Sequence, residues 1–169
     1  MDKSTERTKK YYDGIAQGYA ELYHNEQKQK LECVLPFTKI TGTVLDLGSG
    51  DGVANTVFNN NTIISLDLSL ELLKLNTNAT KLVATALILP LKDKSIDCVF
   101  SLSVLQDVSD LNQTLVEIKR VLKPTGRIIL SILKRNTEKV QHFEKTLTSL
   151  FTIEKIIEED KDKIFIGRY

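Results

Sequence analysis

Two acids and three alternating glycines form the clearest chemical pattern in this chain. Asp46 lies at the end of a short apolar run, and the glycines follow it directly as Gly48, Gly50 and Gly52. A second acid, Asp67, ends the next apolar run. Glycine has no Cβ, so its backbone can approach a ligand closely, and we expect amides of this loop to meet one part of the ligand. A carboxylate after the second strand can accept ribose hydroxyl protons. The pattern therefore indicates a nucleoside-binding site.

The spacing of the glycines bears on which nucleoside is bound. The dinucleotide fingerprint is Gly-x-Gly-x-x-Gly, and its third glycine position falls on Val53 in this chain. Gly52 instead produces the pattern Gly-x-Gly-x-Gly. A nicotinamide-dependent oxidoreductase is therefore a disfavoured alternative.

The residue types that usually hold metals are sparse. The chain has two cysteines, Cys33 and Cys98, and two histidines, His24 and His142, with no Cys-x-x-Cys pair. Zinc sites need such ligands at close and regular spacing. We therefore expect no metal site, and we expect both cysteines to be reduced and packed.

Length and composition set the broad class. With 169 residues, 41% of them hydrophobic and 27% charged, the chain is expected to form one globular domain, residues 1–169. A net charge of +1 provides no general attraction to nucleic acid or acidic membranes. The sequence has neither a bilayer-spanning apolar run nor the apolar segment of a signal peptide, so we expect a cytoplasmic protein.

Strand-like and helix-like segments alternate along the chain. We expect helices near 26–35, 51–59, 110–122 and 137–150, and one that begins at Ser69. We expect strands near 43–47, 62–67, 80–85, 96–104, 127–133, 151–157 and 162–168. This order predicts an α/β fold, a three-layer sandwich with a Rossmann-like, seven-stranded, mainly parallel sheet and helices on both faces. The ligand should then lie at the carboxyl ends of the strands.

Four segments resemble one known family, in the same order along the chain. Residues 44–52 resemble motif I of class I S-adenosylmethionine-dependent methyltransferases. Residues 89–97 and 117–127 resemble the "Leu-Pro-Phe … Ser-Phe-Asp" and "Glu-x-x-Arg-Val-Leu-Lys-Pro-Gly-Gly" stretches of the ubiquinone/menaquinone-biosynthesis-like (type 11) branch. Residues 12–19, Tyr-Asp-x-x-Ala-x-x-Tyr, are similar to its N-terminal lid, which implies a helical lid over residues 1–36. Residues 19–30 look most like archaeal members.

The resemblance implies S-adenosylmethionine as the cofactor and a role for each matching residue. Asp46 would attract the ligand's ammonium group, Asp67 would bind both ribose hydroxyls, and Leu68 would lie against the adenine. The full cofactor-binding set that the resemblance implies is Tyr12, Tyr19, Asp46, Gly48, Gly50, Asp67, Leu68, Thr85, Ala86, Ser101 and Gln106.

One position departs from the family. The acid that usually accepts the adenine amino group lies five residues before the Pro90 position, where this chain has Thr85. A neutral hydroxyl accepts such a hydrogen bond more weakly than a carboxylate. We therefore expect a looser grip on the cofactor than is usual.

Catalytic residues are less apparent than cofactor residues. A sulfonium already activates its methyl group, so orientation and exclusion of water can supply much of the acceleration. Asp107 is a weak candidate for a base or a positioning group, and the alternative is a solvated loop acid.

The sequence supports three functions within this resemblance. The first is a methyltransferase for a small molecule. The second is a tRNA or protein methyltransferase working with an activating subunit, and the third is a non-catalytic relative that binds cofactor or a partner. The sequence does not specify the methyl acceptor or the oligomeric state.

Overall fold

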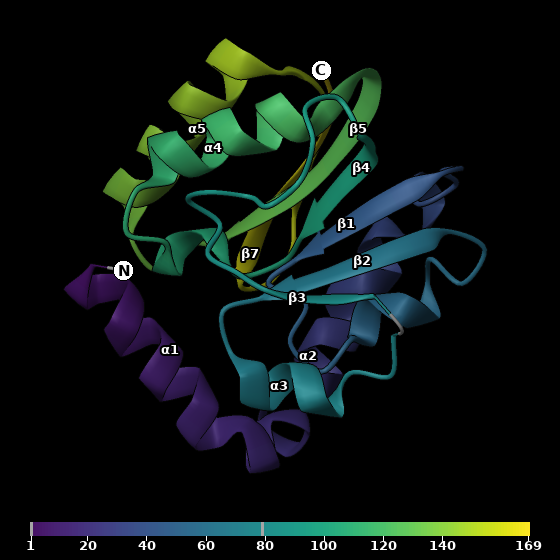
Figure 1. Ribbon diagram of the computed structural model, residues 1–169. Helices are drawn as coiled ribbons and strands as arrows, with labels where there is room; N and C mark the ends of the chain where they lie inside the picture. Colours follow the sequence, from purple (N-terminus) through teal and green to yellow (C-terminus); the bar gives the residue numbers. More distant parts are fainter. Residues whose placement is uncertain (1, 79) are drawn as a thin grey trace.

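The computed structural model describes residues 2–78 and 80–169, without the side chain of His24. Within these residues one sheet of seven strands has the order β3-β2-β1-β4-β5-β7-β6 (Figure 1). The strands are β1 Thr43–Leu47, β2 Thr62–Asp67, β3 Lys81–Val83, β4 Ile96–Ser101, β5 Leu122–Leu133, β6 Thr152–Glu158 and β7 Asp162–Arg168. Strands β1 to β5 are mutually parallel, whereas β7 is antiparallel to both β5 and β6. This is the mainly parallel seven-stranded sheet that the sequence predicts.

Helices cover both faces of the sheet, and α4 and α5 pack side by side on one of them (Figure 1). The α-helices are α1 Lys3–Ile15, α2 Tyr19–Val34, α3 Leu70–Leu75, α4 Leu111–Val121 and α5 Thr137–Leu150. Short 3-10 helices are η1 Ala16–Gly18, η2 Leu35–Phe37, η3 Val53–Thr56 and η4 Leu105–Asp107. No α-helix among the described residues is long and apolar enough to cross a membrane, and the cytoplasmic location stays a prediction.

The core is divided by the sheet into two apolar layers. Alternate residues of the central strands point to opposite faces, so Leu45 packs in one layer and Val44 in the other. The first layer lies under α4 and α5 and contains Leu115 and Phe143, and the second lies under α2 and contains Leu31. Central strands buried on both faces explain the continuous apolar runs in the sequence.

Several expected elements differ from the structure in extent. The helix expected near 26–35 begins at Tyr19 as α2, and the strand expected near 127–133 begins at Leu122 as β5. The helix expected at 51–59 is only the 3-10 helix η3, because Gly52 precedes it in a left-handed conformation (φ 88°) and β-branched residues and asparagines follow. The strand expected at 96–104 ends at Ser101. Cys98 is buried as expected, whereas Cys33 is exposed.

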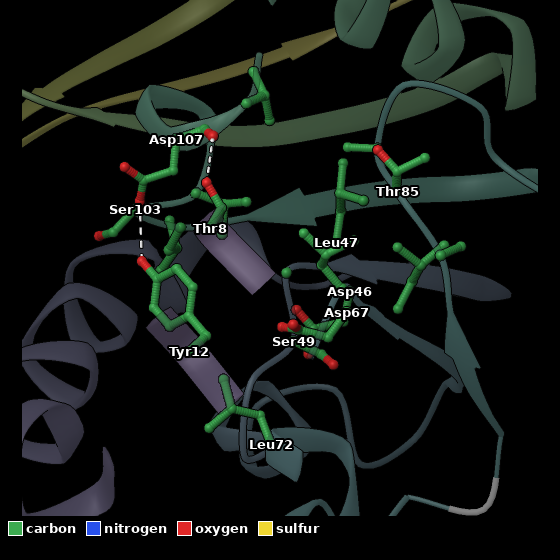
Figure 2. A pocket seen from close by; sticks show the side chains of 18 of the residues that line it. Thr8, Tyr12, Asp46, Leu47, Ser49, Asp67, Leu72, Thr85, Ser103 and Asp107 are labelled. Carbon is green, nitrogen blue, oxygen red and sulfur yellow. Dashed lines mark hydrogen bonds between the residues drawn. The ribbon is translucent and has the colours of Figure 1, made fainter. Parts of the chain in front are cut away.

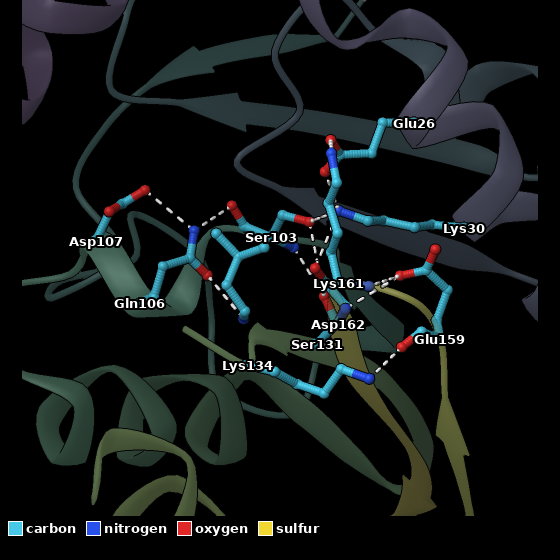
Figure 3. Close-up of polar contacts among 11 residues, drawn as sticks. Glu26, Lys30, Ser103, Gln106, Asp107, Ser131, Lys134, Glu159, Lys161 and Asp162 are labelled. Atoms are coloured by element: carbon cyan, nitrogen blue, oxygen red, sulfur yellow. Dashed lines mark hydrogen bonds and ion pairs between the residues drawn. The ribbon is translucent and has the colours of Figure 1, made fainter. Parts of the chain in front are cut away.

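A buried ionic network fastens α2 to the sheet (Figure 3). The Lys30 ammonium is 0% exposed and lies 2.6 Å from Glu26 Oε1 and 3.0 Å from Asp162 Oδ1. It also donates to Ser103 Oγ at 2.6 Å, and the hydroxyls of Ser103 and Ser131 both donate to Asp162 Oδ2. The network therefore joins α2, the loop after β4, β5 and the start of β7.

Removing the Lys30 charge should destabilise the fold, because Asp162 would remain buried without its cation. We expect Lys30→Met to lower the free energy of unfolding in urea by about 3–5 kcal/mol. The double variant Lys30→Met/Asp162→Asn should recover part of this loss. The exposed Lys155→Met is the matched control, and a Lys30→Met protein within about 0.5 kcal/mol of wild type would contradict the assignment.

Candidate functional site

The turn after β1 is closed by its own backbone amides. Gly48 N–H and Ser49 N–H both donate to the Leu66 carbonyl, at 2.7 and 3.1 Å, and Gly50 N–H donates to Asp67 Oδ2 at 2.9 Å. These three amides are therefore occupied within the protein. The turn offers them to β2, and the expectation that this loop meets a ligand stays a prediction. A phosphate-binding loop needs free amides, so this geometry also disfavours a dinucleotide.

Glycine is required in this turn because protein side chains lie against it. Gly48 has φ +75°, and a Cβ there would lie 2.3 Å from Val104 Cγ2. Gly52 has φ +88°, and its Cβ would lie 2.5 Å from Asn76 Cγ. At both positions the backbone conformation and the close packing exclude a larger residue. The glycine pattern thus marks a tightly packed turn rather than an open cradle.

Asp67 is the acid that holds this turn against the end of β2. Its Oδ2 accepts from Gly50 N–H, and its Oδ1 accepts from Ser69 N–H at 2.8 Å. Burial raises the pKa of Asp67, although the two amide bonds favour the charged form. Each carboxylate oxygen keeps a further lone pair, so a ligand's hydroxyl groups can also bind there.

Asp46 has a buried oxygen without a partner. The residue is 3% exposed, and Oδ2 forms no hydrogen bond with any part of the chain that the structure describes. Burial, with the nearby charges of Asp67 and Asp51, raises the pKa of Asp46 to about 8. A buried carboxylate is stable only when it is protonated or paired with a cation. The site is therefore suited to a positively charged ligand group.

A cavity lies over these two acids, at the carboxyl ends of β1, β2 and β4 (Figure 2). Of the residues expected to bind cofactor, those that line it are Tyr12, Tyr19, Asp46, Gly48, Asp67, Leu68, Thr85 and Ala86. The candidate base Asp107 also lines it. The structure thus gathers most of the expected site from α1, α2 and four other segments far apart in the sequence.

Three expected residues do not line this cavity. Gly50 lies under the Tyr19 ring, where an added Cβ would come within 3.4 Å of Tyr19 Cε1. Ser101 is fully buried, and its hydroxyl donates to the Leu47 carbonyl at 2.8 Å. Gln106 lines a neighbouring groove and donates to the Ser103 carbonyl at 2.6 Å. None of the three lines the cavity itself, and their direct contact with a cofactor stays a prediction.

Helix α1 crosses the mouth of the cavity and is attached by polar contacts at both ends. Near its start the Thr5 and Ser109 hydroxyls lie 3.2 Å apart, and near its end Ser69 donates to Asp13 at 2.6 Å. Between them Tyr12 donates to Asp107 Oδ2 at 2.9 Å (Figure 2). Burial and the Asp107 charge raise the pKa of Tyr12, so its hydroxyl remains a donor.

Sequence reasoning missed several lining residues, among them Thr5, Thr8 and Ser103. Thr5, Thr8 and Tyr12 are spaced three and four residues apart, which places them on one face of α1. That spacing could have revealed the two threonines. Ser103 adopts φ 57°, and no pattern in the sequence indicates this conformation.

No group of three or more histidine, cysteine, aspartate or glutamate side chains within residues 2–78 and 80–169 is arranged to hold a metal ion.

The raised pKa of Asp46 predicts a pH-dependent stability. In the ligand-free protein the folded state keeps this proton up to about pH 8, whereas the ordinary pKa of an aspartate is 3.8. Between these two values the folded state binds more protons than the unfolded state, so stability due to Asp46 falls as pH rises. We therefore expect Asp46→Asn to be more stable than wild type in urea above pH 8, with an advantage that shrinks towards acid pH. An advantage of equal size at all pH values would contradict this.

Comparison with protein families matches residues 45–130 to the methyltransferase domain. The uncharacterized protein MJ1252 of Methanocaldococcus jannaschii is 34% identical over 174 residues, covering 92% of this chain and 68% of that protein. The malonyl-[acyl-carrier protein] O-methyltransferase of a Methylovorus species is 33% identical over 159 residues, covering 82% of this chain and 53% of that enzyme. The chain thus spans about two thirds of the first relative and about half of the second.

The fold is also found in solved structures. A methyltransferase in complex with the Trm112 activator of Haloferax volcanii superposes with a TM-score of 0.73 at 18% identity, covering 93% of this chain and 96% of that one. The family match extends from β1 to β5 and includes Asp46, Asp67 and Thr85. The chain therefore belongs to the methyltransferase domain family.

Proposed function

We propose that this protein transfers a methyl group from S-adenosylmethionine to a small-molecule acceptor, with residues 1–36 acting as a lid over the cavity. The observation that supports this best is the pair of buried acids in the cavity floor. Asp46 has an oxygen free for a cation, and Asp67 is placed to accept hydroxyl protons. S-adenosylmethionine carries both an ammonium group and a ribose with two hydroxyls.

The other lining residues fit the rest of the cofactor. Leu68 and Ala86 supply an apolar surface and backbone for the adenine, and Thr85 supplies a hydroxyl at its edge. Tyr12 and Tyr19 come from the lid side and would cover the methionyl end. Their rings, with centroids 6.5 Å apart, exclude water from that end of the cavity.

The bound cofactor supplies an activated methyl group, so the protein's task is to orient an acceptor and keep water out. Asp107 lies at the cavity wall and can take a proton from an acceptor that arrives protonated. Tyr12 fixes the Asp107 carboxylate through the hydrogen bond described above. We therefore propose Asp107 as the base and Tyr12 as its positioning residue.

A small-molecule acceptor is favoured by the curated relative that acts on a malonyl group. A second candidate is a methyltransferase that works with an activating subunit, since the Haloferax volcanii neighbour was solved with Trm112. The two differ in what the isolated chain can do, because an enzyme that needs an activator should lack full activity alone. Methyl transfer by the purified chain therefore separates them.

The proposal predicts that the isolated protein binds S-adenosylmethionine in calorimetry and that Asp67→Asn weakens this binding about 10- to 100-fold. The reason is that hydrogen bonds to a charged acceptor contribute about 1.5–3 kcal/mol each. The exposed Asp160→Asn removes the same charge from the β6–β7 turn and serves as the control.

Activity is measured by the transfer of a labelled methyl group from S-adenosylmethionine to a cell extract. The extract is then separated into metabolites, RNA and protein. Label in the metabolite fraction supports the proposal, and label only in RNA or protein favours the alternative. Equal cofactor affinity in Asp67→Asn and wild type would overturn the assigned site.

Thr85 provides a gain-of-affinity test. Its Oγ1 lies at the cavity wall and accepts only a long hydrogen bond of 3.3 Å from Leu87 N–H. Thr85→Asp would place a charged acceptor there, and we expect tighter binding of S-adenosylmethionine by about tenfold in calorimetry. Thr125→Asp, at the opposite end of the sheet, should leave the affinity unchanged. Weaker binding by Thr85→Asp would show that Thr85 does not face the adenine.

A further inference from the structure

A second hollow, which we call the outer groove, opens directly from the cofactor cavity. The two share Thr8, Tyr12, Tyr19, Gln27, Ser103 and Asp107 in their walls. The outer groove is bounded by α1, α2, the loop after β4 and the first turn of α5. A molecule in this groove would therefore reach Asp107 and the methionyl end of the cavity.

The far wall of the outer groove is basic. Arg7 comes from α1, Arg135 from the loop after β5, and Lys139 from the first turn of α5. These side chains are far apart in the sequence and meet only in the folded protein. The N-terminal end of α5, a helix of 14 residues, adds a partial positive charge at the same wall.

The acids of the groove are already engaged, whereas its two arginines are free. Glu26 pairs with Lys30 and Lys161, and Asp107 accepts from Tyr12 and Gln106. By contrast, Arg7 and Arg135 form neither an ion pair nor a side-chain hydrogen bond with any residue that the structure describes.

Lys139 is nearly as free, since its only contact is with the Gln106 carbonyl at 3.2 Å. The groove is therefore lined by three exposed cations, of which the two arginines have no protein acceptor among the described residues and Lys139 has one.

We infer that the methyl acceptor carries an oxyanion, a carboxylate or a phosphate, which Arg7 and Arg135 bind at the outer wall with Lys139 beside them. This inference rests on the proposed function. Guanidinium groups bind both oxyanions through paired, parallel hydrogen bonds. Binding the charged end at the far wall leaves the other end of the acceptor to extend past Tyr12 towards the methyl group.

Simple oxyanions test this site apart from catalysis. Sodium malonate and sodium phosphate are titrated, at constant ionic strength, into protein saturated with S-adenosylmethionine, and backbone amide shifts are followed by NMR. We expect saturable shifts centred on residues 135–139, with the stronger anion identifying carboxylate or phosphate. Arg7→Gln/Arg135→Gln should weaken binding about fivefold or more, since exposed ion pairs contribute up to about 1 kcal/mol each.

The control Lys3→Gln/Lys145→Gln removes two exposed charges outside the groove, one from α1 and one from α5, and it should bind the anions as wild type does. Absence of saturable shifts up to tens of millimolar, or equal anion affinity in both double variants, would overturn the inference. It would also fail if the arginine variant lost affinity for S-adenosylmethionine in calorimetry, because the arginines would then hold the cofactor's own carboxylate. If the wild-type protein bound the anions but did not bind S-adenosylmethionine, that result would refute the proposed function alone.

Discussion

The hydrogen bond from Gly50 N–H to the Asp67 carboxylate is the interaction on which the site depends. It connects the turn after β1 to the end of β2, and the two amides before it bind the Leu66 carbonyl in the same strand. Because the turn is held in this way, Asp46 stays in the cavity wall with one buried oxygen that has no hydrogen-bond partner among the described residues. The protein thus keeps a buried carboxyl group available for a cationic ligand, and burial raises the pKa of Asp46 to about 8, so the group stays protonated at neutral pH until a cation binds.

The Lys30 network fixes the loop after β4, as the Gly50–Asp67 hydrogen bond fixes the turn after β1. Ser103 sits in a left-handed conformation next to the residues that line both hollows, and Lys30 and Asp162 bind its hydroxyl from behind. The loop after β4 is therefore fixed by buried charges rather than by apolar packing alone. A precise loop matters here because Asp107 follows four residues after Ser103.

Much of the fold could be predicted from the sequence, because buried parallel strands produce apolar runs that turn residues interrupt. The acids at the ends of β1 and β2 could also be found, since strand ends are visible in the sequence. The hydrogen-bond partners of the turn's amides could not be predicted, because the bond from Gly48 N–H to the Leu66 carbonyl depends on how β1 and β2 align. The Lys30 network was equally hidden, since an isolated lysine in a polar helix predicts exposure. The basic wall of the outer groove needed the fold to bring Arg7 and Arg135 together.

The way in which α1 is attached has a consequence for turnover. Its contacts at Thr5, Tyr12 and Asp13 join hydroxyl and carboxylate groups that water can satisfy almost as well. Detaching this helix therefore costs far less free energy than disrupting either apolar layer of the sheet. Under the proposed function, exchange of the cofactor would then need only α1 to detach, while the seven strands and their buried charges stay in place.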